Sequence, residues 1–171
     1  MLKLAGAMLV LLSGTLIGFR QAARYADRAA QIRQLIHVLQ RLETEIGFGH
    51  TPLPEALERA AAGAAEPVAA LFLRTAGRLR EGGAAVRDAL RAAVDEGWSR
   101  TAMREPERSA VIRLGDALGI SDREDQIRHL RLASALLQAE EAGARDEQAR
   151  YGKMWRSLGF MAALLVVILM L

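Results

Sequence analysis

The sequence predicts an all-α protein, in which a bundle of helical hairpins lies between two apolar terminal helices that span a membrane. Alanine, leucine, arginine and glutamate dominate the middle of the chain, and this mixture favours helix. No segment shows the alternation of apolar and polar residues that indicates a strand. Both ends are apolar, because residues 1–19 carry one charged side chain, Lys3, and residues 158–171 carry none.

The composition excludes several classes of function. The chain of 171 residues contains no cysteine, so it has no disulfide framework, no thiolate nucleophile and no cysteine-ligated metal. A formal net charge of +3 is too small to indicate binding to nucleic acid. The length is that of one domain with little else.

The first predicted element is a membrane helix over residues 1–19. Its apolar run from Leu4 to Phe19 is too long for a signal peptide, and no clean cleavage site follows it. A helix of this run is about 24 Å long, slightly short for a hydrocarbon core of about 30 Å. The side chains of Lys3 and Arg20 can reach the interface and cover the difference.

The last predicted elements are a polar helical stalk over residues 140–157 and a second membrane helix over residues 158–171. Aromatic and basic residues at the end of the stalk are typical of a membrane interface; the alternative is an apolar tail that packs on a partner or lies in the interface. Arginines and a lysine flank both helices on their inner sides, so we expect a two-pass protein of the cell membrane with a cytoplasmic soluble domain. Small residues at a spacing of four are candidates for close helix packing: Gly14, Gly18, Gly159 and Ala163.

The predicted cytoplasmic bundle covers residues 20–139. Apolar residues from Ile32 to Ile46 recur at steps of three and four, which predicts that the first helix continues to about Gly47. Thr51 and Pro52 are typical of an N-cap and a first helical residue. Later helix ends are predicted at Gly63, Gly82–Gly83, Gly97 and Gly119, later starts at Pro67 and Pro106, and Ser121-x-x-Glu124 is a capping box that begins the last helix.

Residues 42–57, LETEIGFGHTPLPEAL, concentrate residue types found in active sites. The pair Gly47-x-Gly49 lacks the third glycine and the lysine of phosphate-binding loops. Glu43 falls inside the apolar stripe and Glu45 on the opposite side, so the two carboxylates cannot act together. His50 has no second ligand at metal-binding spacing. We therefore predict no catalytic, cofactor-binding or metal-binding residue, and interpret the stretch as a corner between helices shaped by Gly49, Thr51, Pro52, Pro54 and Glu55.

Glu43 is nevertheless unusual, because a carboxylate in an apolar stripe needs a partner. Candidate partners are Arg59, Arg78 and Arg113, in a buried ion pair that fixes the register of the hairpins. The alternative is a solvated Glu43 at the edge of the stripe. In the first case Glu43→Ala should lower the melting temperature by several degrees.

The loops are the candidate contact surfaces, because contacts concentrate on loops held by a rigid scaffold. They are the loop from Gly47 to Pro54, the loop Gly82–Gly83, and the turn from Gly119 to Glu124, which includes Ser121 and Asp122. The alternative is that these residues serve hairpin geometry alone. The segment from Gly49 to Leu57 also resembles residues 82–90 in its apolar spacing, as any Ala/Leu-rich hairpin would.

Three segments carry a resemblance to a known family. MLKLAGAMLVLLSGTLIGF, LQRLETEIGFGHTPLPEAL and LGDALGISDREDQ resemble the stage III sporulation protein AB family of endospore-forming bacteria. LPEAL and its counterpart at residues 82–90 also resemble the cytoplasmic domain of the type II secretion F protein, the inner-membrane platform of type II secretion and type IV pilus machines.

The resemblance implies a non-enzymatic membrane platform or adaptor in the complex that links mother cell and forespore. Its soluble domain would face the mother-cell cytoplasm and contact a secretion-type ATPase, stage III sporulation protein AA, while its membrane helices contact other membrane components of the complex. The chain has one helical domain and two membrane helices, against two and three in the secretion protein, so a platform would require a homo-oligomer. Alternatives are a secretion or pilus platform subunit outside sporulation, a membrane hydrolase using Glu43 and His50, and a receptor with a helical stalk.

Overall fold

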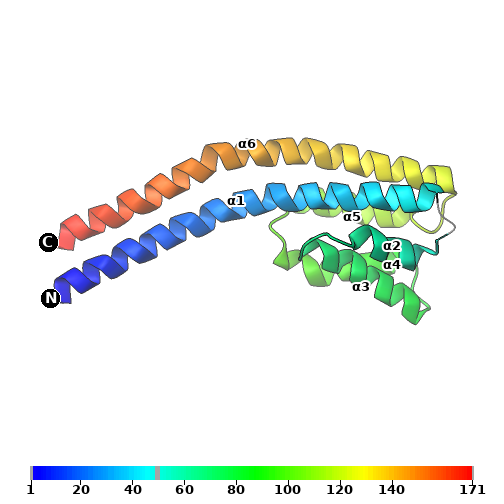
Figure 1. Cartoon of the computed structure of the whole chain (residues 1–171), viewed down its shortest axis with the longest axis horizontal. Helices are drawn as coiled ribbons and strands as arrows, with labels where there is room; N and C mark the ends of the chain where they lie inside the picture. Colours follow the sequence, from blue (N-terminus) through cyan, green and yellow to red (C-terminus); the bar gives the residue numbers. More distant parts are fainter. Residues whose placement is uncertain (1, 49–50, 171) are drawn as a thin grey trace. The chain divides into compact units, whose positions relative to one another are not determined.

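The computed structural model describes residues 2–48 and 51–170, and all regular structure within them is helical (Figure 1). This confirms the predicted all-α class. Two helices are long: α1 has 47 residues and α6 has 48. The bounds are α1 Leu2–Phe48, α2 Leu53–Ala61, α3 Val68–Glu81, α4 Val86–Gly97, the 3₁₀ turn η1 Trp98–Arg100, α5 Glu105–Ala117 and α6 Arg123–Met170.

The chain divides into two units. The terminal unit consists of Met1–Ala29 with Gly143–Leu171, and the bundle unit consists of Ala30–Ala142. Each long helix therefore contributes one segment to the terminal unit and one to the bundle unit.

In the terminal unit, α1 and α6 run antiparallel. The rings of Tyr25 and Tyr151 stack with centroids 5.7 Å apart, and Arg28 Nη1 lies 3.4 Å from Glu147 Oε2. Within the part of the chain that the structure describes, no helix carries an apolar stretch long enough to cross a membrane. Gly18 is buried, whereas the side-chain environments of Gly14, Gly159 and Ala163 lie outside the described residues.

In the bundle unit, α1 and α6 are again antiparallel and four shorter helices lie beside them (Figure 1). Arg131 Nε lies 2.7 Å from Glu43 Oε1, and Arg33 Nε lies 2.8 Å from Glu141 Oε1. The helix α3 contacts both α2 and α4, and α4 also contacts α5. The helices between α1 and α6 thus form two successive hairpins, α2–α3 and α4–α5, as the fold prediction required.

The core of the bundle unit is built on the apolar stripe of α1. Ile32, Leu35, Leu39 and Leu42 are completely buried, which confirms the predicted stripe, and only Ile46 at its end is partly exposed. Burying each such side chain contributes about 1.5–3 kcal/mol. The largest partners from the other helices are Leu57, Leu71, Phe72, Leu114, Leu130 and Leu137.

Two glycines lie where helices of the hairpins approach most closely. A Cβ atom on Gly115 of α5 would lie 2.9 Å from Leu90 Cδ2 on α4, and a Cβ atom on Gly97 would lie 2.7 Å from Leu71 Cδ2 on α3. Leu71 and Leu90 are both buried, so they have little room to move aside. The sequence predicted Gly97 only as the end of a helix. The structure shows that it also allows close packing against Leu71.

Two predicted helix caps are wrong by one residue. Thr51 is not the N-cap of α2, because Pro52 occupies that position and its carbonyl accepts a hydrogen bond from Ala56 N at 3.0 Å. Ser121 and Glu124 do not form a capping box, because Asp122 Oδ1 accepts from Asp125 N at 2.8 Å. The Ser121 hydroxyl instead donates to Ala117 O at 2.8 Å, which keeps Ser121 attached to the end of α5.

Substitution of Gly115 by leucine should destabilise the protein. The new side chain would force α4 and α5 apart, at a cost of about 1–3 kcal/mol, and each kcal/mol lowers the melting temperature of a chain this size by about 2–4 °C. Thermal unfolding of the full chain in detergent, followed by circular dichroism, measures the change. Gly143→Leu is the control, because Gly143 is exposed on α6 with open space around it; equal melting temperatures for the two variants would contradict the packing role of Gly115.

Candidate functional site

The three loops predicted as contact surfaces lie at the same end of the bundle unit. A Cβ atom on Gly119 would lie 2.6 Å from Val86 Cγ2 and 3.8 Å from Leu53 Cδ2, so the turn after α5 meets the first residues of α4 and of α2. Figure 1 shows the ends of α1 and α3 and the start of α6 at this same end. We call this surface the loop end and define it as residues 47–54, 81–88 and 119–125; Gly49 and His50 lie outside the described residues.

Two large apolar side chains project from the loop end. Phe48, the last residue of α1, is 92% exposed, and Ile120, in the turn before α6, is 75% exposed. These are the two highest values among the large apolar residues of the described chain. Nearby Leu53 and Val86 are half-buried against Gly119. The exposed pair is a candidate anchor for a partner, since aromatic and large apolar residues supply much of the binding energy at interfaces.

The backbone at the loop end depends on glycine. Gly82, Gly83 and Gly119 have φ angles of +83°, +84° and +81°, a conformation that costs glycine little and other residues more. Gly82 and Gly83 are exposed in the α3–α4 loop and present no side chain there. The prediction that these glycines end helices is confirmed.

The helices α2, α4 and α6 all begin at the loop end. Their first turns carry Glu55, Asp88 and Glu124, and carboxylates at these positions interact favourably with the helix dipole. Pro52 is exposed and Pro54 half-buried at the start of α2. Residues 81–88 and 119–125 together contain five acidic residues, Glu81, Asp88, Asp122, Glu124 and Asp125, against two basic residues, Arg87 and Arg123, so the surface is acidic.

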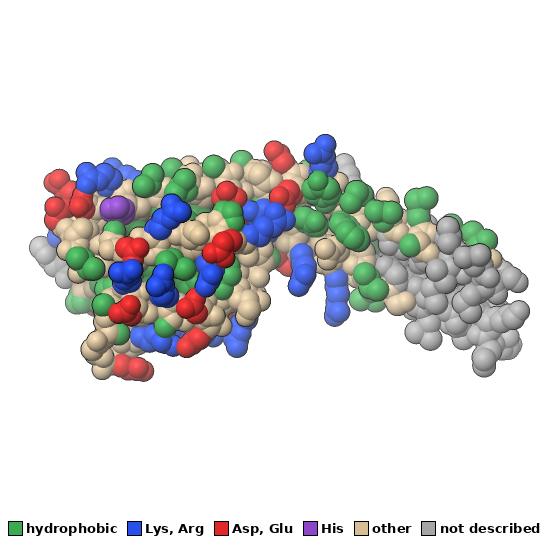
Figure 2. All heavy atoms as spheres, turned by 180° about the vertical axis from the view of Figure 1, so that it is seen from behind, with side chains coloured by type: hydrophobic (Ala, Val, Ile, Leu, Met, Phe, Trp, Pro, Cys, Tyr) green, Lys and Arg blue, Asp and Glu red, His purple; other side chains and the backbone are tan. Residues whose placement is uncertain are grey.

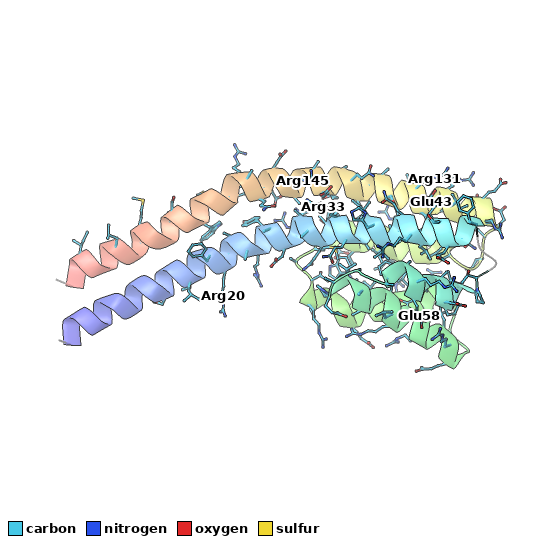
Figure 3. All side chains as sticks on the ribbon, in the orientation of Figure 1. Arg20, Arg33, Glu43, Glu58, Arg131 and Arg145 are labelled. Carbon is cyan, nitrogen blue, oxygen red and sulfur yellow. The ribbon has the colours of Figure 1, made fainter. Side chains whose placement is uncertain are left out.

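The two glutamates of the corner sequence point to different helices. Glu43 pairs with Arg131 of α6 (Figure 3), whereas Glu45 Oε2 lies 3.6 Å from Arg59 Nη1 of α2. The predicted opposite orientations are therefore confirmed. Glu43 has a partner, but none of the three predicted arginines was the right one.

The ion pair of Glu43 is not buried either. The Glu43 side chain is 24% exposed and that of Arg131 is 70% exposed. Arg59 instead pairs with Glu45 and Glu55, and Arg78 pairs with Glu96. The sequence could not identify Arg131 as the partner, because the register between α1 and α6 depends on the lengths of all the helices and loops between them.

One structural carboxylate was missed. Glu107, in the first turn of α5, is completely buried, and its Oε2 accepts a hydrogen bond from Arg104 N at 2.7 Å. The signal was present, since glutamate at the third position of a helix commonly returns to the backbone of the N-cap residue. Beside it, the hydrogen bond that the Arg108 guanidinium donates to Asp95 Oδ1 raises the pKa of Arg108, which stays charged and links α4 to α5.

Among residues 2–48 and 51–170, no group of three His, Cys, Asp or Glu side chains is placed to hold a metal ion. The exposed His37 and His129 lie on different helices, α1 and α6. What the geometry offers is a surface with apolar anchors and charged surroundings, which suits protein contact.

Comparison with known proteins identifies the family of the chain. The family model for stage III sporulation protein AB matches residues 3–171. The chain belongs to the stage III sporulation protein AB family. Stage III sporulation protein AB of Bacillus subtilis (strain 168) is 39% identical over 171 residues, which cover all of both chains. A solved structure of a stage III sporulation protein AB is 36% identical and superposes with a TM-score of 0.69 over 72% of this chain and 98% of that one.

Removing the ion pair between Glu43 and Arg131 should cost this family member little. A double-mutant cycle of Glu43→Ala and Arg131→Ala should give a coupling free energy of about 0.2–1 kcal/mol, as for other exposed pairs. Thermal unfolding at low and high salt measures it, and salt should weaken the coupling because both side chains reach solvent. A coupling well above 2 kcal/mol that salt does not change would indicate a buried pair instead.

Proposed function

We propose that the protein is a non-enzymatic membrane platform or adaptor of the sporulation complex that links mother cell and forespore. In this proposal the loop end binds a secretion-type ATPase, stage III sporulation protein AA, on the cytoplasmic side. The observation that carries the proposal is the convergence of three loops with two exposed apolar side chains, Phe48 and Ile120. Family membership supplies the sporulation context and favours it over a pilus or secretion platform.

The position of the loop end within the bundle unit suits such a partner. The unit is entered at Ala30 and left at Ala142, and the loop end lies at the opposite ends of these two helix segments, at Phe48 and Arg123. A protein bound there would contact the bundle unit at the end away from Ala30 and Ala142. The acidic residues of the loop end favour a partner with a basic surface, because complementary charge speeds association and orients the two proteins.

The membrane part of the proposal is supported by the sequence. Residues 1–19 contain one charged side chain and residues 158–171 contain none. Arg20 and Arg24 follow the first segment, Arg150 precedes the second, and all three are exposed. Basic residues on the inner flanks favour a cytoplasmic bundle unit, with both terminal segments inserted in the bilayer and in contact with other membrane components.

The role as a platform rather than an enzyme is supported by the separation of Glu43 and Glu45. Their carboxylates face α6 and α2, so these two glutamates do not form an acid–base pair with each other. The buried Glu107 and its backbone partner have a structural use at the start of α5.

Shortening both anchors should weaken ATPase binding. The double variant Phe48→Ala, Ile120→Ala removes two exposed apolar side chains, and losses above 1 kcal/mol each are typical of interface anchors, so the dissociation constant should rise by about tenfold or more. Titration of the purified ATPase with the full chain in detergent measures it. Leu73→Ala is the matched control, because Leu73 is 45% exposed in the middle of α3, away from the loop end; an unchanged affinity for the double variant would contradict the proposed docking surface.

The proposed orientation can be tested in a chain that has no cysteine of its own. A cysteine at the exposed position Asp88 should react with a membrane-impermeant maleimide only after cells are permeabilised. A cysteine added after Leu171 should react in intact cells. Labelling of Asp88→Cys in intact cells would place the loop end outside the cytoplasm and rule out a cytoplasmic ATPase as its partner.

A further inference from the structure

A small pocket lies between α1 and the connection that joins α2 to α3. It encloses about 130 Å³. Its lining residues are Gln34, His37, Val38 and Arg41 of α1 with Gly63 and Ala64 of the connection. The four positions on α1 are three and four residues apart, so they share one face of the helix. None of the six residues belongs to the loop end, so a ligand bound here would use a separate surface.

The pocket contains a guanidinium group that the chain itself holds in place. Arg41 donates a hydrogen bond to the backbone carbonyl of Ala62. A Cβ atom on Gly63 would lie 3.5 Å from Arg41 Nη1, and Gly63 has a φ angle of +85°, so glycine both permits the turn and leaves space for the guanidinium. Because arginine carries five N–H donors, several remain for a ligand after the bond to Ala62.

The charge of the pocket is not balanced by its own residues. On the face of the molecule that Figure 2 shows, basic and acidic side chains lie interspersed, and ion pairs such as that of Arg78 with Glu96 neutralise many of them. In contrast, none of the described residues that line the pocket is acidic, and Arg41 forms no ion pair with a carboxylate of residues 2–48 and 51–170. The pocket therefore favours an anionic ligand.

The side-chain amide of Gln34 adds a second requirement for the ligand. Its Oε1 atom is buried and has no hydrogen-bond partner among the described residues. Buried oxygen atoms in proteins are nearly always hydrogen-bonded, so a ligand that donates to Gln34 gains affinity. Gln34 and Arg41 start about 10 Å apart along the axis of α1. A ligand that meets both therefore carries an N–H donor and an anion separated by one or two residues of extended chain.

We propose that this pocket binds the carboxyl terminus of a partner polypeptide. The terminal carboxylate would accept hydrogen bonds from Arg41, and a backbone N–H of the last two residues would donate to Gln34 Oε1. Capture of a terminal carboxylate is an established mode of peptide recognition. Pockets for drug-sized ligands enclose about 300–1,000 Å³, so this one is too small for them. A chain end only has to enter the pocket, whereas an internal acidic residue would need room for the chain to leave again.

Peptide titration followed by NMR tests the proposal. The probe is N-acetyl-alanyl-alanine, whose small side chains suit the wall formed by Val38 and Ala64. Added to the full chain in detergent, it should shift the amide resonances of Gly63 and Ala64 in a saturable way. The same peptide with an amidated terminus lacks the carboxylate, and acetate lacks the N–H, so both should bind more weakly. No saturable shift, or equal affinity for the amidated peptide or for acetate, would overturn the proposal.

Two substitutions separate the contributions of the two groups. Arg41→Gln removes the cation and should raise the dissociation constant of the free-acid peptide by about tenfold or more. Gln34→Leu removes the acceptor, so it should weaken binding of the peptide and leave that of acetate unchanged. Arg113→Gln is the matched control, because Arg113 is an exposed arginine of α5 that does not line the pocket. Melting temperatures show that each variant is folded. Unchanged affinity of Arg41→Gln, or an equal loss in Arg113→Gln, would overturn the proposal.

Discussion

The antiparallel pairing of α1 and α6 in the bundle unit constrains everything between them. Because α1 ends where α6 begins, the chain must leave and return at the same end of the unit. If each helix runs opposite to the one before it, only an even number of helices between α1 and α6 brings the chain back to the end from which it left. The structure has four such helices, arranged as two hairpins. Three connections then necessarily fall at the departure end. The loop end is thus a consequence of how the outer helices pair, and its candidate contact residues are brought together by topology.

The two hairpins meet this constraint with similar local solutions. Leu57 of α2 and Leu90 of α4 are both buried, each beside a buried alanine, Ala56 and Ala89. Each of these helices starts at the loop end with an acidic residue in its first turn. The similarity of the two segments in sequence therefore corresponds to a similarity in position and burial. The tight contact at Gly97 joins the second hairpin to α3 of the first, and the tight contact at Gly115 joins the two helices of the second hairpin.

The sequence predicted the helices well because helix ends depend on local chemistry. Glycine at positive φ and proline near helix starts act within a few residues, so the ends at Phe48, Glu81 and Gly97 lay close to expectation. Interactions between distant helices were harder to predict. The partner of Glu43 was missed because Arg131 lies 88 residues away, and its position depends on the length of every helix between them. The cap error at Ser121 arose because its neighbour Asp122 also has a side-chain oxygen that accepts backbone hydrogen bonds. At the start of α2 the N-cap is Pro52, and no side chain caps the helix.

The pairing of α1 with α6 also bears on the order in which the chain folds. Contacts among the helices between α1 and α6 join residues that are close in sequence. Arg78 and Glu96 are 18 residues apart, and Glu58 and Arg80 are 22 residues apart. Those that join α1 to α6 span 88 and 108 residues. Local contacts form faster because less chain entropy is lost in closing them. During synthesis the hairpins can therefore pack on one side of α1 while the side that faces α6 is still exposed to solvent. The bundle unit is complete only after the first half of α6 has been synthesised.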